Sequence, residues 1–267
     1  MIGLSGRLHV TLYMMLKMLG YVEAALCLAA ICFVVSKRQW SQYWALGWFV
    51  VVRLVTNLSL AVVMHSAEQL GRATAYHTYF LIYWLNLSML SILALFILYG
   101  VLRQTLEPLK GVRRVSSLVF QVAVAVLVLV ALISAFIPQH SGLSLMMAAT
   151  SQLQRMQNVF TLCVVLLLWL VMRPLGLSAG SRAFGVSLGL GLLAINDVAQ
   201  TAWLYVNPEL GQRVSLINGA VVCATLMIWT IYFAKREPRR GGMTLSDGSP
   251  LLRWNAAWLP QTPDAQE

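Results

Sequence analysis

The chain has 267 residues and a net charge of +10; 59% of the residues are hydrophobic and only 10% are charged. Soluble globular proteins carry about 25% charged residues, so a soluble chain of this composition would lack the polar groups to cover its surface. The composition therefore excludes a water-soluble enzyme, a disordered chain and a disulfide-stapled secreted domain, and it predicts a multi-pass protein in contact with the lipid bilayer.

Seven stretches are apolar and long enough to cross the bilayer as helices, which takes about 20 residues. In chain order, the predicted spans are 14–35, 43–64, 75–99, 118–137, 153–173, 183–206 and 214–233. All eight prolines fall in connections or in the tail, so unkinked helices are expected. The predicted fold class is all-α, a polytopic seven-transmembrane-helix bundle. Its expected parts are a short extracytoplasmic N-terminus (1–13), the transmembrane domain (14–233) and a basic, then flexible cytoplasmic tail (234–267).

Lysine and arginine are unequally divided between the two sides of this predicted bundle. Thirteen lie in the connections 36–42 and 100–117, in the fifth connection and in the tail, and five lie on the opposite side. Because cytoplasmic loops carry the excess of basic residues, the N-terminus is predicted outside and the C-terminus in the cytoplasm. Topology and attraction to anionic headgroups explain the positive charge, so no nucleic-acid partner is expected.

The tail contains one apolar segment around Arg253. Its members are Leu251, Leu252, Trp254, Trp258 and Leu259. They predict a short interfacial turn of helix, and a partner-docking peptide is the alternative. Within the sixth span, Gly185 and Gly189 lie four residues apart, which favours close packing against a neighbouring helix of the same bundle over a dimer seam.

Three predicted spans carry a charged residue, which is costly in the membrane interior and usually faces a partner or a cavity. These residues are Glu23, Arg53 and Asp197. At a rise of about 1.5 Å per residue, they lie about 15–21 Å from the cytoplasmic ends of their spans, and Asn86 lies at about the same depth. The sequence therefore predicts one polar layer near the middle of the bilayer.

Residue spacing groups further polar side chains with this layer. Arg53 and Asn57 share a helical face, as do Asp197 and Gln200. The hypothesis is that Asp197, Glu23 or both hold Arg53, and that Asn57, Asn86 and Gln200 complete its hydrogen bonds. Asn218 is expected to join from the outer end of the last span.

Two carboxylates against one guanidinium leave one surplus negative charge in this predicted layer. A proton, a bound cation or a cationic ligand would relieve that surplus. The layer is therefore interpreted either as a ligand or proton pocket or as a structural lock that fixes the helix register.

An outer rim above the layer is predicted from aromatic residues and histidines at the ends of the second and third spans. Its members are His65, Tyr76, His77, Tyr79 and Tyr83. Interfacial ring residues explain this group better than a metal or haem site, so no metal and no cofactor are expected. No nucleotide-binding, zinc-protease or serine-hydrolase motif occurs in the sequence, and no catalytic residues and no enzyme activity are expected.

Three segments carry a resemblance to a known family. They are the tyrosine-rich entry to the third span (Tyr76, Tyr79, Tyr83 and Trp84), the basic connection around Pro108 and Arg113, and the glycine-rich run from Gly176 through Gly191. In these segments the chain resembles an uncharacterised acidobacterial family of seven-helix integral membrane proteins, over most of residues 10–235. The resemblance implies a bacterial inner-membrane location and assigns no activity or site residues.

Three functions remain open at this point. The first is a sensory or small-ligand-binding membrane module with its pocket in the outer half of the bundle; signalling would then need a cytoplasmic protein partner. The second is a small-solute or proton-coupled transporter, although the proline-free spans do not suggest broken helices. The third is an accessory subunit that packs against a larger membrane complex.

Overall fold

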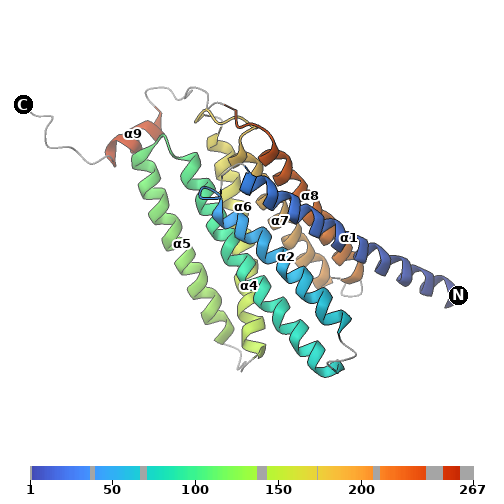
Figure 1. The fold of residues 1–267 in the computed structure, drawn as a ribbon. Coiled ribbons are helices and arrows are strands. Elements are labelled where there is room, and N and C mark those ends of the chain that lie inside the picture. Colours follow the sequence, from blue (N-terminus) through green and yellow to red (C-terminus); the bar gives the residue numbers. More distant parts are fainter. Residues whose placement is uncertain are drawn as a thin grey trace, which may run out of the picture.

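The structure is a computed structural model that describes residues 2–36, 40–66, 71–136, 143–172, 174–206, 211–238 and 249–258. Its helices are α1 (Ile2–Ser36), α2 (Trp44–His65), α4 (Arg72–Thr105), α5 (Lys110–Phe136), α6 (Leu143–Met172), α7 (Arg182–Val206), α8 (Gly211–Ala234) and α9 (Pro250–Ala257) (Figure 1). Seven of these helices are long and apolar enough to cross a membrane, so the predicted all-α, seven-span fold is confirmed.

Four helices, α1, α4, α5 and α6, extend well beyond the predicted spans, and at the basic residues between the third and fourth spans the difference has a clear cause. The third prediction ended at residue 99 and the fourth began at residue 118, whereas α4 continues to Thr105 and α5 begins at Lys110. The apolar pattern stops where basic residues begin, but the helical backbone continues because long basic side chains can extend from a helix end to the headgroups.

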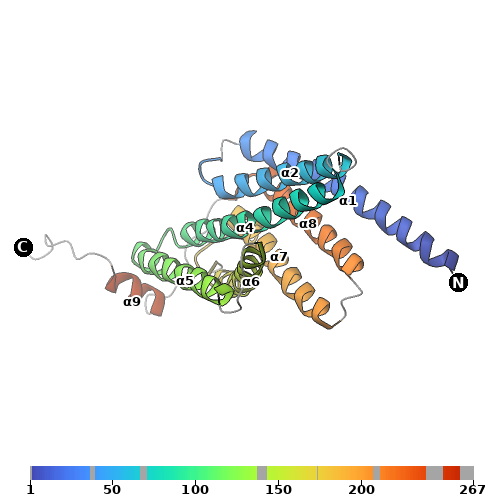
Figure 2. The same ribbon diagram turned by 90° about the horizontal axis from the view of Figure 1, so that it is seen from below.

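The bundle is arranged around α4, which packs against α2, α5, α6 and α7. Viewed from below, α4 separates the α1–α2 pair from α5 and α6 (Figure 2). Helix α1 packs against α2 and α8, which places the first and last spans side by side. We call the end where α2, α5 and α7 begin the basic end, and the opposite end the far end.

Aromatic packing closes the basic half of the bundle between α2 and α8. The rings of Tyr43 and Phe233 lie 5.0 Å apart, and those of Phe49 and Trp229 lie 5.7 Å apart, both edge to face. Gly189 of α7 permits this packing, because a Cβ there would lie 2.2 Å from Nε1 of Trp229. The predicted close approach of the glycines within one bundle is therefore confirmed, and α8 is the neighbour.

Polar contacts tie the helix ends together at the basic end. Arg182, at the start of α7, donates a hydrogen bond from Nη1 to Oε2 of Glu237 at 2.9 Å. The Tyr43 hydroxyl donates to Oε1 of Gln104 at 2.9 Å. Burial raises the pKa of the Tyr43 phenol from its ordinary value to about 12.

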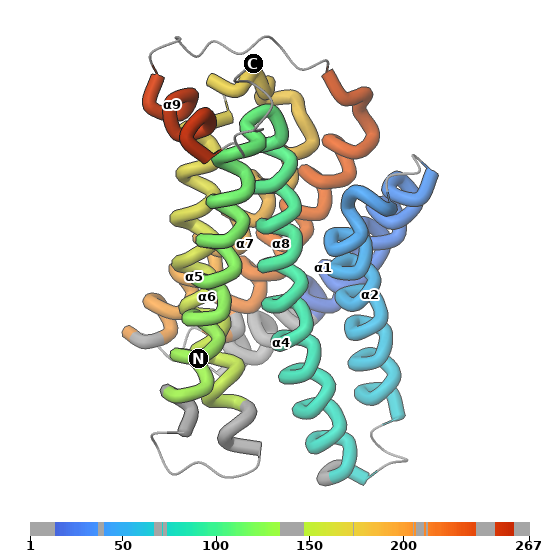
Figure 3. Tube along the Cα trace, turned by 90° about the vertical axis from the view of Figure 1, so that its left-hand side faces the viewer, coloured from blue at the N-terminus to red at the C-terminus, as the bar shows by residue number. Residues whose placement is uncertain are grey.

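The apolar tail segment forms α9, which lies against the start of α5 (Figure 3). Leu251 and Leu252 pack on the buried side chains of Leu106, Leu109 and Leu175. The backbone N–H of Gly111 donates to Oδ1 of Asn255 at 2.9 Å. The predicted helical turn is thus confirmed and lies against the chain's own bundle; Leu259, the last residue of the predicted segment, lies outside the described residues.

Candidate ligand-binding cavity

A polar cavity of about 280 Å³ lies among α2, α4, α6, α7 and α8. Six of the seven predicted pocket residues line it: Arg53, Asn57, Asn86, Asp197, Gln200 and Asn218. The seventh, Glu23 of α1, is buried behind Arg53 and does not line the cavity. Residues from spans distant in the sequence therefore meet at one level.

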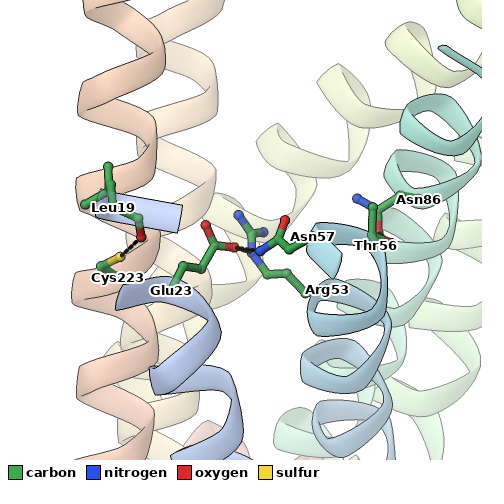
Figure 4. A network of polar contacts seen from close by, with 7 residues as sticks. All are labelled: Leu19, Glu23, Arg53, Thr56, Asn57, Asn86 and Cys223. Carbon is green, nitrogen blue, oxygen red and sulfur yellow. Dashed lines mark hydrogen bonds and ion pairs between the residues drawn. The ribbon is translucent and has the colours of Figure 1, made fainter. Parts of the chain in front are cut away.

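One wall of the cavity is formed by an ion pair between α1 and α2. Nε of Arg53 donates to Oε1 of Glu23 at 2.5 Å, and Nδ2 of Asn57 donates to the same oxygen at 2.9 Å. Figure 4 shows Arg53 and Asn57, one turn apart on α2, both directed toward Glu23. Of the two acids considered for Arg53, Glu23 holds the guanidinium, and the two charges compensate each other.

Asp197 lines the same cavity from α7 and forms no hydrogen bond or ion pair with Arg53. Its Oδ2 accepts hydrogen bonds from Nε2 of Gln154 and Nδ2 of Asn158 on α6, both at 3.2 Å. Within the described part of the chain, no donor forms a hydrogen bond with Oδ1 and no cationic side chain forms an ion pair with Asp197. One carboxylate oxygen is therefore left for a ligand.

The other predicted pocket residues do not contact Arg53 through hydrogen bonds. Asn86 accepts a hydrogen bond from the Thr56 hydroxyl at 2.9 Å, and Asn218 accepts one from Asn196 at 2.9 Å. Nε2 of Gln200 is buried and has no protein hydrogen-bond partner among the described residues. These side chains line the cavity without completing the ion pair, so the predicted single network is divided into separate groups.

A polar stripe on α6 supplies cavity residues that the sequence analysis missed. Gln154, Gln157, Asn158 and Thr161 follow one another at i, i+3, i+4 and i+7, and all four line the cavity. This spacing places them on one helical face, which was the signal that could have identified them. Thr161 is only 1% exposed, and its hydroxyl has no hydrogen-bond partner in the described structure.

Of the five predicted rim residues, only Tyr83 lines the cavity. The remaining rim residues, His65, Tyr76, His77 and Tyr79, are exposed at the far ends of α2 and α4. The rings of Tyr76 and His77 contact each other at 6.2 Å between centroids. The structure therefore places Tyr83 in the cavity wall and the other four on the surface around it.

The charges on the cavity wall define what the cavity can bind. Among its described lining residues, Arg53 and Asp197 are the only charged groups, and Arg53 is already compensated by Glu23. A carboxylate in the membrane interior that forms no described ion pair favours a positively charged partner or a proton. The cavity is close to the lower limit of about 300 Å³ for small-molecule pockets.

Comparisons with family models, with curated proteins and with solved structures give no match for this chain. The class of protein is therefore defined by the fold and the site. The chain is a multi-pass, seven-helix membrane protein with a polar cavity inside the bundle.

Proposed function

We propose that this protein is a sensory or ligand-binding module of a bacterial inner membrane, and that its cavity binds a small molecule with a cationic group. In the proposed orientation the N-terminus lies outside, and the basic end, with the C-terminus, faces the cytoplasm, in agreement with the excess of lysine and arginine there. The resemblance noted from the sequence supports the bacterial location.

The observation that carries the proposal is the environment of Asp197. Its Oδ2 accepts two amide hydrogen bonds from α6, and these bonds orient the carboxylate. Its other oxygen has no described protein donor, and Arg53, the cationic residue in the described lining of the cavity, is paired with Glu23. A carboxylate fixed in this way can pair with an ammonium group of a ligand.

Two buried polar atoms support a ligand that also carries hydrogen-bonding groups. Nε2 of Gln200 offers a donor and the Thr161 hydroxyl offers a donor and an acceptor, and neither is satisfied by the described protein. Leaving a buried polar group without a partner costs about 1–3 kcal/mol. A small amine with a hydroxyl or carbonyl group would satisfy both charge and hydrogen bonding.

The ion pair between Glu23 and Arg53 is given a structural role in this proposal. It joins α1 to α2 and satisfies its own charges. The two interpretations of the polar layer, a structural lock and a binding pocket, are thereby assigned to different carboxylates. Glu23 fixes the packing of α1 against α2, and Asp197 binds the ligand. A signal would reach a cytoplasmic partner through α4 and α7, since both helices line the cavity and extend to the basic end.

Thermal unfolding of the purified protein in lipid nanodiscs tests this function with ethanolamine, choline and putrescine as probes. At least one amine is expected to raise the Tm of the unmodified protein, and Asp197→Asn should abolish the shift. Glu237→Gln, which removes a carboxylate at the basic end, is the matched control and should retain it. No shift with any amine, or an unchanged shift in Asp197→Asn, would contradict the proposal.

Proteoliposomes containing the same protein separate sensing from transport. A binding module changes its stability with the amine and does not accumulate it inside the vesicles. Accumulation of radiolabelled amine above protein-free vesicles would replace the sensory proposal by transport.

A further inference from the structure

A second cavity, of about 600 Å³, lies between α4 and α5 at the basic end. Its lining includes four basic residues, Arg103 of α4 and Lys110, Arg113 and Arg114 of α5. It shares no lining residue with the polar cavity described above. The two cavities therefore represent separate sites, with opposite charge requirements.

The basic cavity has no internal compensation. None of its lining residues is acidic, and among the described residues none of its four cations forms an ion pair. Arg182, at the same end of the bundle, contrasts with them because it is paired with Glu237. Four like charges gathered in one concavity repel one another, and an anion with several acceptor oxygens relieves that repulsion.

A hydrogen bond between the two helices fixes the inner wall of this cavity. The hydroxyl groups of Tyr99 on α4 and Ser117 on α5 lie 2.7 Å apart, and both residues line the cavity. They lie about one turn further along their helices from the basic end than Arg103 and Arg113. The bond holds α4 and α5 together beneath the four cations, so the shape of the cavity is set by the packing of the two helices.

The depth of the cavity identifies the source of the anion. Arg103 lies in the last turn of α4 and Lys110 is the first residue of α5, so the charges stand where both spans leave the hydrocarbon. Further into the membrane, exposed apolar side chains follow on both helices: Phe96 is 48% exposed and Leu118 is 61% exposed. If a phospholipid places its phosphate beside the cations, its acyl chains would lie along these apolar side chains.

We propose that the cavity between α4 and α5 binds an anionic phospholipid, with its phosphodiester held by Arg103, Lys110, Arg113 and Arg114. Basic pockets between transmembrane helices at the cytoplasmic side suit anionic headgroups. A free phosphate compound would use the same cations but would not extend along the exposed apolar side chain of Leu118, which also lines the cavity. The site does not depend on the amine proposed for the polar cavity.

Native mass spectrometry of the full-length protein tests this site, with phosphatidylglycerol titrated into detergent-purified samples. The unmodified protein is expected to bind phosphatidylglycerol more tightly than phosphatidylcholine of the same chains. In the double variant Arg103→Gln with Arg114→Gln, affinity for phosphatidylglycerol should fall roughly thirtyfold, because each basic residue contributes about 1 kcal/mol at an anionic surface.

The matched control is Lys235→Gln with Arg236→Gln, which removes two exposed cations from the same end of the bundle. This control should retain the affinity for phosphatidylglycerol, and equal losses in the two double variants would overturn the site. Equal affinity for phosphatidylcholine, or displacement of the lipid by sn-glycerol 3-phosphate, would also overturn it. If the Arg103 and Arg114 double variant does not fold, Arg114→Gln alone should show about a fivefold loss.

Discussion

The two halves of the bundle differ in how their interiors are packed. In the basic half, aromatic rings of α2 and α8 interlock, and the absence of a side chain at Gly189 lets Trp229 lie against α7. Toward the far end, polar side chains of α2, α4, α6, α7 and α8 surround a cavity instead. In the proposed function, the packed half provides rigidity and the half with the cavity provides room for a ligand.

The ion pair of Glu23 and Arg53 lies between these two halves, and we expect its disruption to cause the largest loss of stability. Glu23→Ala leaves the guanidinium without its carboxylate, and loss of one partner from a buried pair costs about 3–5 kcal/mol. Unfolding of the variant in mixed detergent micelles should therefore show the largest loss of stability in this set.

The double variant Glu23→Gln with Arg53→Gln serves as its control. Removing both charges abolishes the unpaired guanidinium, so the double variant should recover most of the lost stability. A double variant as unstable as Glu23→Ala would contradict a structural role for the pair.

The packed half makes the second prediction. Gly189→Ala forces Trp229 to move, since the added Cβ would lie 2.2 Å from its Nε1. Overpacking of this kind costs about 1–3 kcal/mol. Gly100→Ala is the matched control, because a Cβ at Gly100 meets nothing within 4 Å; its unfolding free energy should stay unchanged or rise slightly. Equal destabilisation of both variants would show that the α7–α8 contact is looser than described.

The third prediction concerns α9, the tail helix at the outer edge of the packed half. Asn255→Ala removes the acceptor of the Gly111 N–H at 2.9 Å, which is expected to cost about 1 kcal/mol. The loss should be local, so hydrogen exchange should accelerate in α9 and at the start of α5 and stay unchanged in α7. Unchanged exchange in α9 would mean that the leucine contacts alone hold the helix.

The open half makes the prediction with the smallest effect on stability. Asp197→Asn keeps the size of the side chain and removes a charge that forms no ion pair with a described residue. Its unfolding free energy should change by less than about 1 kcal/mol, in contrast to Glu23→Ala, which removes a carboxylate that an arginine needs. A loss as large as that of Glu23→Ala would assign Asp197 to the structural lock instead.

The sequence predicted the seven spans and brought Arg53 and Asp197 to one polar layer, because span length and the cost of a buried charge are properties of the bilayer. It left the partner of Arg53 open, since depth along a helix does not define the rotation of that helix about its axis. The fifth predicted span began at residue 153, whereas α6 begins at Leu143. Gln154 and Asn158 therefore fell at the end of the predicted span, and the stripe to which they belong was missed.

The helix lengths at the basic end could not be obtained from hydropathy for a related reason. The stretches of α4 and α5 beyond the predicted spans contain Arg103 and Lys110, which end an apolar pattern without ending a helix. The basic cavity lies between the parts of α4 and α5 that hydropathy did not predict, so the sequence alone could not predict the cavity.

The central claim, that the polar cavity selects cations through Asp197, is tested most directly by cysteine accessibility. In a variant whose four native cysteines are replaced by alanine, Ser91→Cys places a thiol in the cavity wall. Its rate of modification is measured with a cationic and with an anionic methanethiosulfonate, relative to the rates with a free thiol. The account predicts a preference for the cationic reagent that Asp197→Asn removes. A preference that is absent, or that survives Asp197→Asn, would contradict it.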